Sequence, residues 1–402
     1  MNKINTDSKQ IDEILNRGTI MEILPTSKEF REKLTSGEKL RFYIGADPTA
    51  KALHLGHAQN LMILEDFRKL GHEVIFLIGD FTGMIGDPTD KSAARVRQTR
   101  EDVENNFKEW LKQVKNILSF EDKDNPVKVK YNSEWLSKLN FKQVIDLASN
   151  FTVQQMLERD MFQKRINENK PIHLHEFLYP LMQGYDSVAM AVDVELCGSD
   201  QIFNALAGRT LMQKLKNKNK FVIAAKLIAD EKTGMLMSKS NGTGIFLDLN
   251  PNDLFGAIMS QPDGMIKPLF LGCTRIYLIK INKLMSLDNP RDAKAKLARE
   301  ITAIYHGEDK AQKAEEEFNK IFRDKSKPTD IPEIKLSKKE CSLLELLIET
   351  KLASSKSDAR RLVQQGGVRI DDVVQKDFEK EVEIKNEMIV QVGKRRFVKI
   401  VL

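Results

Sequence analysis

Short apolar runs alternate with helix-period patterns up to about residue 246 of the chain. The runs that resemble strands lie at 40–44, 74–78, 127–131, 192–196 and 221–225. After the first run, apolar residues recur at helical spacing at Leu61, Leu64, Phe67 and Leu70. Strands that alternate with helices are typical of a parallel sheet with helices on both faces. This part of the chain therefore predicts an α/β fold with a doubly wound parallel sheet.

Three segments of different character follow this region. Residues 247–324 carry helical patterns, for example over 292–301, and predict a small helical domain. Residues 325–338 are rich in charge, contain Pro328 and Pro332, and predict a linker. Residues 339–402 combine two helical patterns with short strand-like runs, which predicts a small α+β domain. We accordingly expect residues 1–246 to form the first and largest domain.

The composition restricts the class of protein. The chain has 402 residues, of which 41% are hydrophobic and 30% charged, as in globular proteins of two or three domains. It contains no apolar run long enough to span a membrane, and its polar N-terminus lacks the apolar core of a signal peptide, so we expect a cytoplasmic protein. The three cysteines are widely separated, which argues against a disulfide framework and against a cysteine metal site.

The formal net charge of +6 is compatible with nucleic-acid binding but does not establish it. Basic residues gather in two runs, which by default predict a solvated surface. These runs are Lys214, Lys216, Lys218 and Lys220, and Lys394, Arg395 and Arg396.

Two short motifs, HLGH at 54–57 and MSKS at 237–240, are candidates for phosphate binding. HLGH follows the first strand-like run and the turn at 45–49, and it begins a helical pattern. At such a junction the free backbone N–H groups attract phosphate, and Gly56 permits close approach. The imidazoles of His54 and His57 can donate to phosphate oxygens. An ordinary helix start is the alternative, as is a zinc site shared with His173 and His175, although no third ligand is indicated.

A further constellation lies at 179–186. Tyr179, Gln183 and Asp186 are separated by four and three positions, so on a helix they project from one face and can line a pocket. The alternative is a buried amphipathic helix whose tyrosine and aspartate form hydrogen bonds only within the protein.

Taken together, these motifs resemble the signature of the class I aminoacyl-tRNA synthetases. With Tyr43 before the turn at 45–49, the segment 179–186 resembles the tyrosine site of the bacterial tyrosyl-tRNA synthetases. The resemblance covers residues 35–402 and implies a Rossmann-like catalytic domain, a helical domain for the tRNA anticodon region, and a homodimer. It also implies a ligase that converts L-tyrosine and ATP, accompanied by Mg²⁺, into tyrosyl-adenylate and pyrophosphate. Tyrosine then passes to the 3′ end of tRNA(Tyr).

The same resemblance implies roles for individual residues. Tyr43 and Asp186 would bind the substrate phenol, Tyr179, Gln183 and Asp87 its ammonium group, and Gln201 would lie near the amino acid. Residues implied at ATP are Gly45, Asp47, Thr49, Gly56, Gly198, Asp200, Met237, Ser238 and Ser240. Charge on the reacting phosphate and on the departing pyrophosphate would be stabilised by His54, His57, Lys239, Lys91 and Arg95.

The segment 354–370 is similar to a small RNA-binding domain shared by a ribosomal small-subunit protein, pseudouridine synthases and the bacterial tyrosyl-tRNA synthetases. A helix in this segment would place Lys356, Arg360 and Arg361 on one side. Their cationic groups could pair with backbone phosphates of RNA.

Two positions depart from the family pattern. Leu236 stands where the family usually has a lysine, which leaves Lys239 as the only lysine of that motif and predicts slower activation. Ala46 is often bulkier in relatives. The alternatives at this point are a tryptophanyl-tRNA synthetase, a synthetase-derived RNA-binding factor without aminoacylation, and a nucleotidyltransferase that acts on another small molecule.

Overall fold

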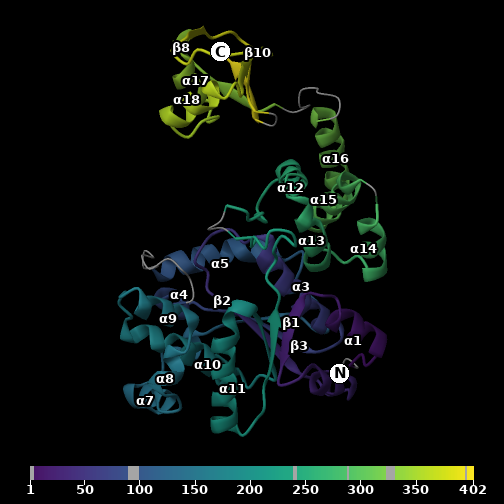
Figure 1. The fold of residues 1–402 in the computed structure, drawn as a ribbon, viewed down its shortest axis with the longest axis vertical. Coiled ribbons are helices and arrows are strands. Elements are labelled where there is room, and N and C mark those ends of the chain that lie inside the picture. Colours follow the sequence, from purple (N-terminus) through teal and green to yellow (C-terminus); the bar gives the residue numbers. More distant parts are fainter. Residues whose placement is uncertain (1–3, 89–98, 239–241, 288, 323–330, 394–395) are drawn as a thin grey trace. The chain divides into compact units, whose positions relative to one another are not determined.

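A computed structural model describes residues 4–88, 99–238, 242–287, 289–322, 331–393 and 396–402 (Figure 1). The chain divides into two compact units, Met1–Glu308 and Asp309–Leu402. In the described parts, no helix is long and apolar enough to cross a membrane.

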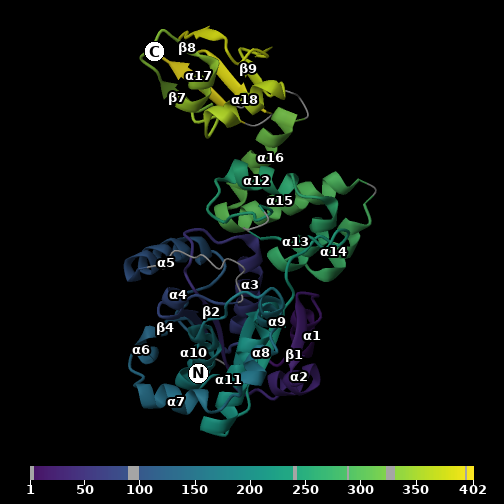
Figure 2. The same ribbon diagram turned by 60° about the vertical axis from the view of Figure 1, so that its left-hand side comes forward.

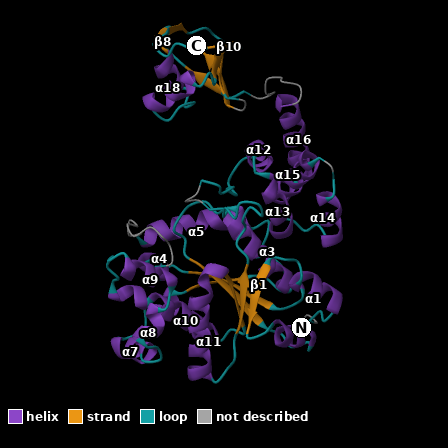
Figure 3. Ribbon diagram, viewed as in Figure 1, coloured by secondary structure: helices purple, strands orange, loops and turns teal. Residues whose placement is uncertain are grey.

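The first unit is built around a sheet, whose strands are drawn in orange in Figure 3. The described residues of this sheet form six strands in the order β1-β6-β5-β2-β3-β4. All five predicted strands are present, and neighbours among them pair in parallel. The sheet also contains β1, which pairs antiparallel with β6 and was not predicted. β1 lies at the edge of the sheet, and only Ile23 in it is buried although four of its five residues are apolar. The strands are β1 (Ile20–Leu24), β2 (Arg41–Ala46), β3 (Glu73–Ile78), β4 (Lys128–Tyr131), β5 (Val194–Gly198) and β6 (Phe221–Ala225).

Helices connect the parallel strands and lie on both faces of the sheet (Figures 1 and 2). The helical spacing noted in the sequence forms α3 (Leu55–Lys69), whose Leu61, Leu64 and Phe67 are buried. The other helices up to β6 are α1 (Ser8–Leu15), α2 (Ser27–Thr35), α4 (Thr82–Ile85), α5 (Arg100–Val114), α6 (Ser133–Leu136), α7 (Phe141–Ala148), α8 (Val153–Leu157), α9 (Asp160–Asn167), η1 (Leu174–Phe177), α10 (Tyr179–Met190), η2 (Ser199–Gln201) and α11 (Ile202–Lys216).

Two glycines allow α10 and α11 to pack closely. A Cβ atom on Gly184 of α10 would lie 3.1 Å from the backbone nitrogen of Gly208 on α11. A Cβ atom on Gly208 would lie 2.5 Å from Nζ of Lys220. The space next to Gly208 therefore holds a lysine ammonium group.

The chain after β6 is helical, as the sequence pattern predicts. The helices are α12 (Pro251–Met259), η3 (Asp263–Met265), α13 (Ile266–Cys273), α14 (Leu278–Met285) and α15 (Pro290–His306). These helices belong to the first compact unit, in which α13 packs against α3. The predicted division between residues 1–246 and 247–324 stays a prediction.

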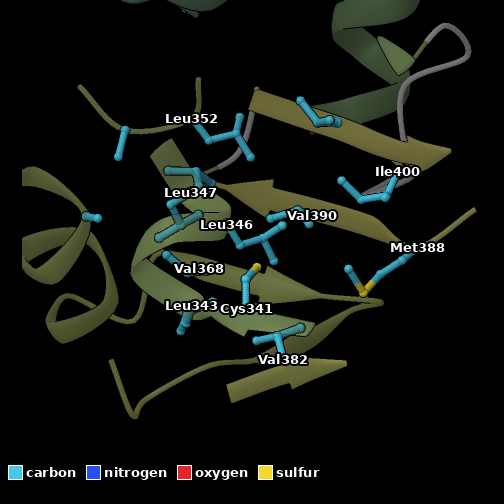
Figure 4. Close-up of a cluster of buried hydrophobic side chains, with 14 of the residues drawn as sticks. Cys341, Leu343, Leu346, Leu347, Leu352, Val368, Val382, Met388, Val390 and Ile400 are labelled. Atoms are coloured by element: carbon cyan, nitrogen blue, oxygen red, sulfur yellow. The ribbon is translucent and has the colours of Figure 1, made fainter. Parts of the chain in front are cut away.

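The second unit is an α+β structure with its own hydrophobic core (Figure 4). Helix α16 (Glu308–Phe322) spans the boundary between the units. One sheet has the order β10-β9-β12-β13-β7, and β11 pairs with β8. Leu343, Leu346, Val390 and Ile400 are fully buried between the helices and the strands. The elements are β7 (Glu333–Lys335), β8 (Glu340–Ser342), α17 (Leu343–Glu349), α18 (Lys356–Gln364), β9 (Val368–Ile370), β10 (Val373–Val374), β11 (Glu381–Glu383), β12 (Ile389–Val392) and β13 (Arg396–Val401).

Candidate active site

The HLGH motif forms the start of α3, immediately after β2 and its following turn. The backbone N–H of Gly56 donates to His54 Nδ1 over 3.1 Å, and the backbone N–H of His54 donates to His57 Nδ1 over 3.2 Å. Burial lowers the pKa of His54 to about 4, so this imidazole is neutral at pH 7. Because both Nδ1 atoms accept hydrogen bonds, the ring proton of each neutral imidazole lies on Nε2. Each histidine therefore keeps one N–H donor for a ligand.

The segment that follows the MSKS motif lies beside the HLGH motif, although the two are far apart in the sequence. His54 forms an antiparallel bridge with Phe246. The backbone N–H of Leu55 donates to the carbonyl of Ile245 over 2.9 Å, and that of Leu247 donates to the carbonyl of Leu53 over 2.9 Å. The chain that follows MSKS is thus fixed beside the helix that HLGH begins.

The described end of the MSKS motif is held by Thr243. The backbone N–H of Ser238 donates to Thr243 Oγ1 over 3.0 Å, and that hydroxyl donates to the carbonyl of Leu236 over 2.8 Å. Met237 is buried, whereas the Leu236 side chain is 40% exposed. Four predicted phosphate-site residues, Lys91, Arg95, Lys239 and Ser240, lie outside the described residues, so their roles stay predictions.

Asp186 is a buried carboxylate on α10. Its Oδ1 accepts a hydrogen bond from Trp135 Nε1 at 2.7 Å, and its Oδ2 accepts one from Asn132 Nδ2 at 3.3 Å. Burial raises the pKa of Asp186 well above its usual value, and the two hydrogen bonds act against this increase. Tyr43 approaches from β2, and its hydroxyl lies 2.9 Å from Ser187 Oγ. Burial, then the charges of Glu195 and Asp186, raise the pKa of Tyr43.

A second hydrogen-bonded group joins Tyr179 to the turn after β2. The Tyr179 hydroxyl donates to Asp47 Oδ2 and the Thr82 hydroxyl donates to Asp47 Oδ1, both over 2.7 Å. Asn132 Nδ2 donates to Thr82 Oγ1 over 2.9 Å and so connects this group to Asp186. A Cβ atom on Gly79 would lie 1.9 Å from Asp47 Oδ1, so a glycine is required there.

A third group forms around Gln201, whose Nε2 donates to Asp87 Oδ2 over 2.7 Å and to Asp200 Oδ2 over 3.4 Å. Asp87 follows β3, Asp200 follows β5, and Asp47 follows β2. These three aspartates therefore gather at the carboxyl ends of neighbouring parallel strands, where open α/β sheets bind their ligands. Among the remaining candidates, Gly45 and Gly198 lie near the ends of β2 and β5, and the backbone N–H of Thr49 donates to the carbonyl of Asp47 over 2.7 Å.

Gln183 contacts a group that the sequence reading missed. Its Nε2 donates to Glu195 Oε1 over 2.9 Å, and Glu195 forms an ion pair with Lys220. The expectation that Lys220 belongs to a solvated basic surface is wrong, because its side chain is fully buried. Lys220 immediately precedes β6 and meets the neighbouring strand β5, which carries Glu195. The sequence signal for this ion pair was Glu195 itself, a charged residue inside the predicted strand 192–196 that would need a partner if buried.

The three candidate RNA-binding residues lie on α18 in the second unit. Lys356 begins the helix. The Arg360 guanidinium lies 4.7 Å from the centre of the Phe378 ring, and Arg361 Nη2 lies 2.7 Å from Asp358 Oδ1. The predicted helix is confirmed, and neighbouring side chains orient both arginines.

Comparison with known proteins identifies the family. Residues 35–323 match the model of the tRNA synthetases class I (W and Y), and residues 324–400 match the tyrosine–tRNA ligase SYY-like C-terminal domain. The tyrosine–tRNA ligase of Geobacter metallireducens is 44% identical over 399 residues, which are 96% of this chain and 98% of the relative. That of Haemophilus influenzae is 43% identical and covers 98% of both chains.

Solved structures share the fold. A truncated mitochondrial tyrosyl-tRNA synthetase from Aspergillus nidulans has a TM-score of 0.65 at 22% identity, over 78% of this chain and 94% of that one. A tyrosyl-tRNA synthetase from Archaeoglobus fulgidus has a TM-score of 0.58 at 20% identity, over 77% of this chain and 99% of that one. The near-full-length relatives favour the tyrosyl assignment over the tryptophanyl and the non-catalytic alternatives. The chain belongs to the tyrosyl-tRNA synthetases of class I.

Proposed function

We propose that this protein is a tyrosine–tRNA ligase. It activates L-tyrosine with ATP to give tyrosyl-adenylate and pyrophosphate, and it then transfers tyrosine to the 3′ end of tRNA(Tyr). The observation that carries the proposal is that Tyr43 of β2 is hydrogen-bonded to α10, the helix that carries Tyr179, Gln183 and Asp186, in a chain 44% identical to a tyrosine–tRNA ligase.

Tyr43 and Asp186 form the phenol end of the proposed tyrosine site. The ionised carboxylate accepts the phenol O–H, and the Tyr43 hydroxyl bonds to the phenol oxygen. Both side chains are almost fully buried, with exposed fractions of 0% for Tyr43 and 3% for Asp186. Phenylalanine would displace water from these buried polar groups without supplying the hydrogen bonds of the phenol, which is costly. The same pair thus provides binding and selection of tyrosine.

Tyr179, Gln183 and Asp87 form the ammonium end of the site. The Asp87 carboxylate supplies negative charge, and the Gln183 carbonyl oxygen supplies an acceptor. Gln201 holds Asp87 over 2.7 Å and lies near the amino acid. The substrate carboxylate is thereby directed toward the phosphate-binding motifs.

The chemistry needs no protein nucleophile, because the tyrosine carboxylate attacks the α-phosphate of ATP. The enzyme aligns the two substrates and stabilises the negative charge that develops on the phosphates. His54 and His57 donate through Nε2, and Lys239, Lys91 and Arg95 supply positive charge. ATP enters as its Mg²⁺ complex, with the cation held mainly by phosphate oxygens and water. The ATP-binding positions are Gly45, Asp47, Thr49, Gly56, Gly198, Met237, Ser238, Ser240 and, at the ribose, Asp200.

The tRNA contacts both the helical segment and the second unit in this proposal. Residues 247–324 take the anticodon region, and Lys356, Arg360 and Arg361 on α18 pair with RNA phosphates. The linker, predicted at 325–338, ends before residue 333 in this proposal, because β7 pairs with β13 in the sheet of the second unit. The protein acts in the cytoplasm, where tRNA is charged.

We further propose that the enzyme is a homodimer. The segment between β4 and α10 carries large apolar side chains that are strongly exposed in a single chain. Phe141 is 80% exposed, Val153 65% and Leu174 80%. A second copy is the expected cover for this surface, and sedimentation equilibrium measures whether the mass is doubled.

Tyrosine-dependent exchange of pyrophosphate into ATP, assayed with each of the twenty amino acids, tests the function. We expect exchange with tyrosine alone, and we expect its loss in Lys239→Ala but not in the control Lys214→Ala, which alters an exposed lysine. Asp186→Asn should weaken tyrosine use without abolishing ATP binding. Exchange with tryptophan instead, or with no amino acid despite tRNA binding, would contradict the proposal.

A further inference from the structure

A buried ion pair lies behind the proposed tyrosine site. The side chains of Lys220 and Glu195 are 0% and 2% exposed, and Nζ contacts Oε2. Charges at such depth persist only with partners that compensate the lost water. Each partner also reaches one further polar side chain. Glu195 Oε1 accepts from Gln183 Nε2 at 2.9 Å, and Lys220 Nζ donates to Ser187 Oγ over 2.9 Å.

Glu195 determines how the Gln183 amide is oriented. An ionised carboxylate can only accept hydrogen bonds, so it requires the NH₂ group of Gln183 to face it. The amide oxygen then points the other way and is an acceptor for the substrate ammonium group. If the carboxylate were replaced by a group that also donates, the amide could rotate by half a turn. It would then present hydrogen atoms to a cation, which is repulsive.

Lys220 has the corresponding effect on Ser187. An ammonium group can only donate, so Ser187 Oγ must accept from it. The same Oγ lies 3.4 Å from Glu195 Oε2 and 2.9 Å from the Tyr43 hydroxyl. The Lys220 ammonium group also lies 5.9 Å from the centre of the Tyr43 ring, within reach of a cation–π attraction. The Tyr43 hydroxyl is therefore fixed by a serine that the ion pair holds in place.

We propose that Lys220 and Glu195 are positioning residues for tyrosine recognition, which hold the Gln183 amide and the Tyr43 hydroxyl in their binding orientations. The inference rests on the proposed function, because it assigns both ends of the tyrosine site to one buried pair. Neither residue needs to touch the substrate. The glycine at 208 supports the assignment, since any side chain there would collide with the Lys220 ammonium group at 2.5 Å.

The decisive variant is the double substitution Lys220→Met with Glu195→Gln, which removes both charges at similar volume and leaves no unpaired buried ion. Its matched control is Arg68→Met with Glu65→Gln, which removes another buried ion pair, whose side chains are 8% and 2% exposed. We expect KM for tyrosine to rise about tenfold in the first variant and less than twofold in the control. KM for ATP should stay within twofold in both, and thermal unfolding reports the general loss of stability.

Ser187→Ala keeps the ion pair and tests the Tyr43 contact separately. It should raise KM for tyrosine several-fold. The weak pyrophosphate exchange that phenylalanine supports at high concentration should stay unchanged, because phenylalanine has no hydroxyl to contact Tyr43. An unchanged KM for tyrosine in the folded double variant overturns the proposal. If the double variant fails to fold, an unchanged KM for tyrosine in Ser187→Ala overturns the proposal instead. Absence of tyrosine-dependent exchange in the unaltered protein would instead refute the proposed function.

Discussion

Replacement of Trp135 by phenylalanine isolates one hydrogen bond at the phenol end of the site. The indole N–H donates to Asp186 Oδ1 over 2.7 Å, and the second donor, Asn132, is more distant at 3.3 Å. Loss of a hydrogen bond to a charged, buried group costs about 1.5–3 kcal/mol. Since 1.4 kcal/mol corresponds to a factor of ten, kcat/KM for tyrosine should fall roughly ten- to hundredfold in Trp135→Phe.

The pH dependence of this variant gives a second, independent readout. Burial raises the pKa of Asp186, and the bond from Trp135 lowers it, so Trp135→Phe raises it further. The ionised carboxylate accepts the phenol O–H more strongly than the protonated form does. Tyrosine affinity therefore falls as the pH drops through this raised pKa, and in the variant the fall should begin at higher pH. Pyrophosphate exchange at several tyrosine concentrations, followed over the pH range in which both proteins stay folded, measures both effects.

The chain contains only two tryptophans, and Trp110 supplies the matched control. Its Nε1 donates over the same 2.7 Å, but to the neutral backbone carbonyl of Ala50. Trp110→Phe should therefore leave the KM for tyrosine and its pH profile close to those of the unaltered protein. Equal effects in the two variants, or a Trp135→Phe enzyme within twofold of the unaltered kcat/KM, would refute this reasoning.

Three other predictions concern activation and stability. Leu236→Lys should raise the rate of adenylate formation several-fold in a rapid-quench assay, because the exposed position lets a second cation reach pyrophosphate; an unchanged rate would argue against a missing cation. Thr243→Val removes the three side-chain bonds of Thr243 at the MSKS segment and should slow adenylate formation about tenfold with KM for tyrosine unchanged; equal changes in the rate and in KM would point to general damage. Burial lowers the pKa of His72 to about 4, below the value of about 6.5 in the unfolded chain. Between these two values the unfolded state binds more protons than the folded state. The free energy of unfolding should therefore fall by up to about 3 kcal/mol as the pH drops from 6.5 to 4. His72→Asn should flatten that part of the curve in urea unfolding, and parallel curves for the two proteins would contradict the assignment.

The inner strands of the parallel sheet were predictable because they are buried on both faces and are therefore rich in apolar residues, as in β3. The edge strand β4 has no buried residue and alternates Lys with apolar residues. The edge strand β1 is also apolar in sequence, but it buries only Ile23 and was not among the predicted strands. Gln183 and Asp186 were predictable in the same way, since helical spacing alone places them on one face. The side chains that contact this helix face from other parts of the fold were not predictable from the sequence. Lys220 meets Ser187 across 33 positions, and Trp135 meets Asp186 across 51, and no periodicity encodes contacts that only the sheet topology creates.

Gly208 makes the order of evolutionary change at this site matter. A lineage that keeps Lys220 cannot accept alanine at 208 without displacing the ammonium group, because the new Cβ would lie 2.5 Å from it. In a lineage that first loses Lys220, the ammonium group no longer collides with a Cβ atom at position 208. Once alanine is established, a returning lysine finds its space filled, so the step is hard to reverse. On a family tree, alanine at this position should therefore mark branches that descend from an ancestor without the lysine.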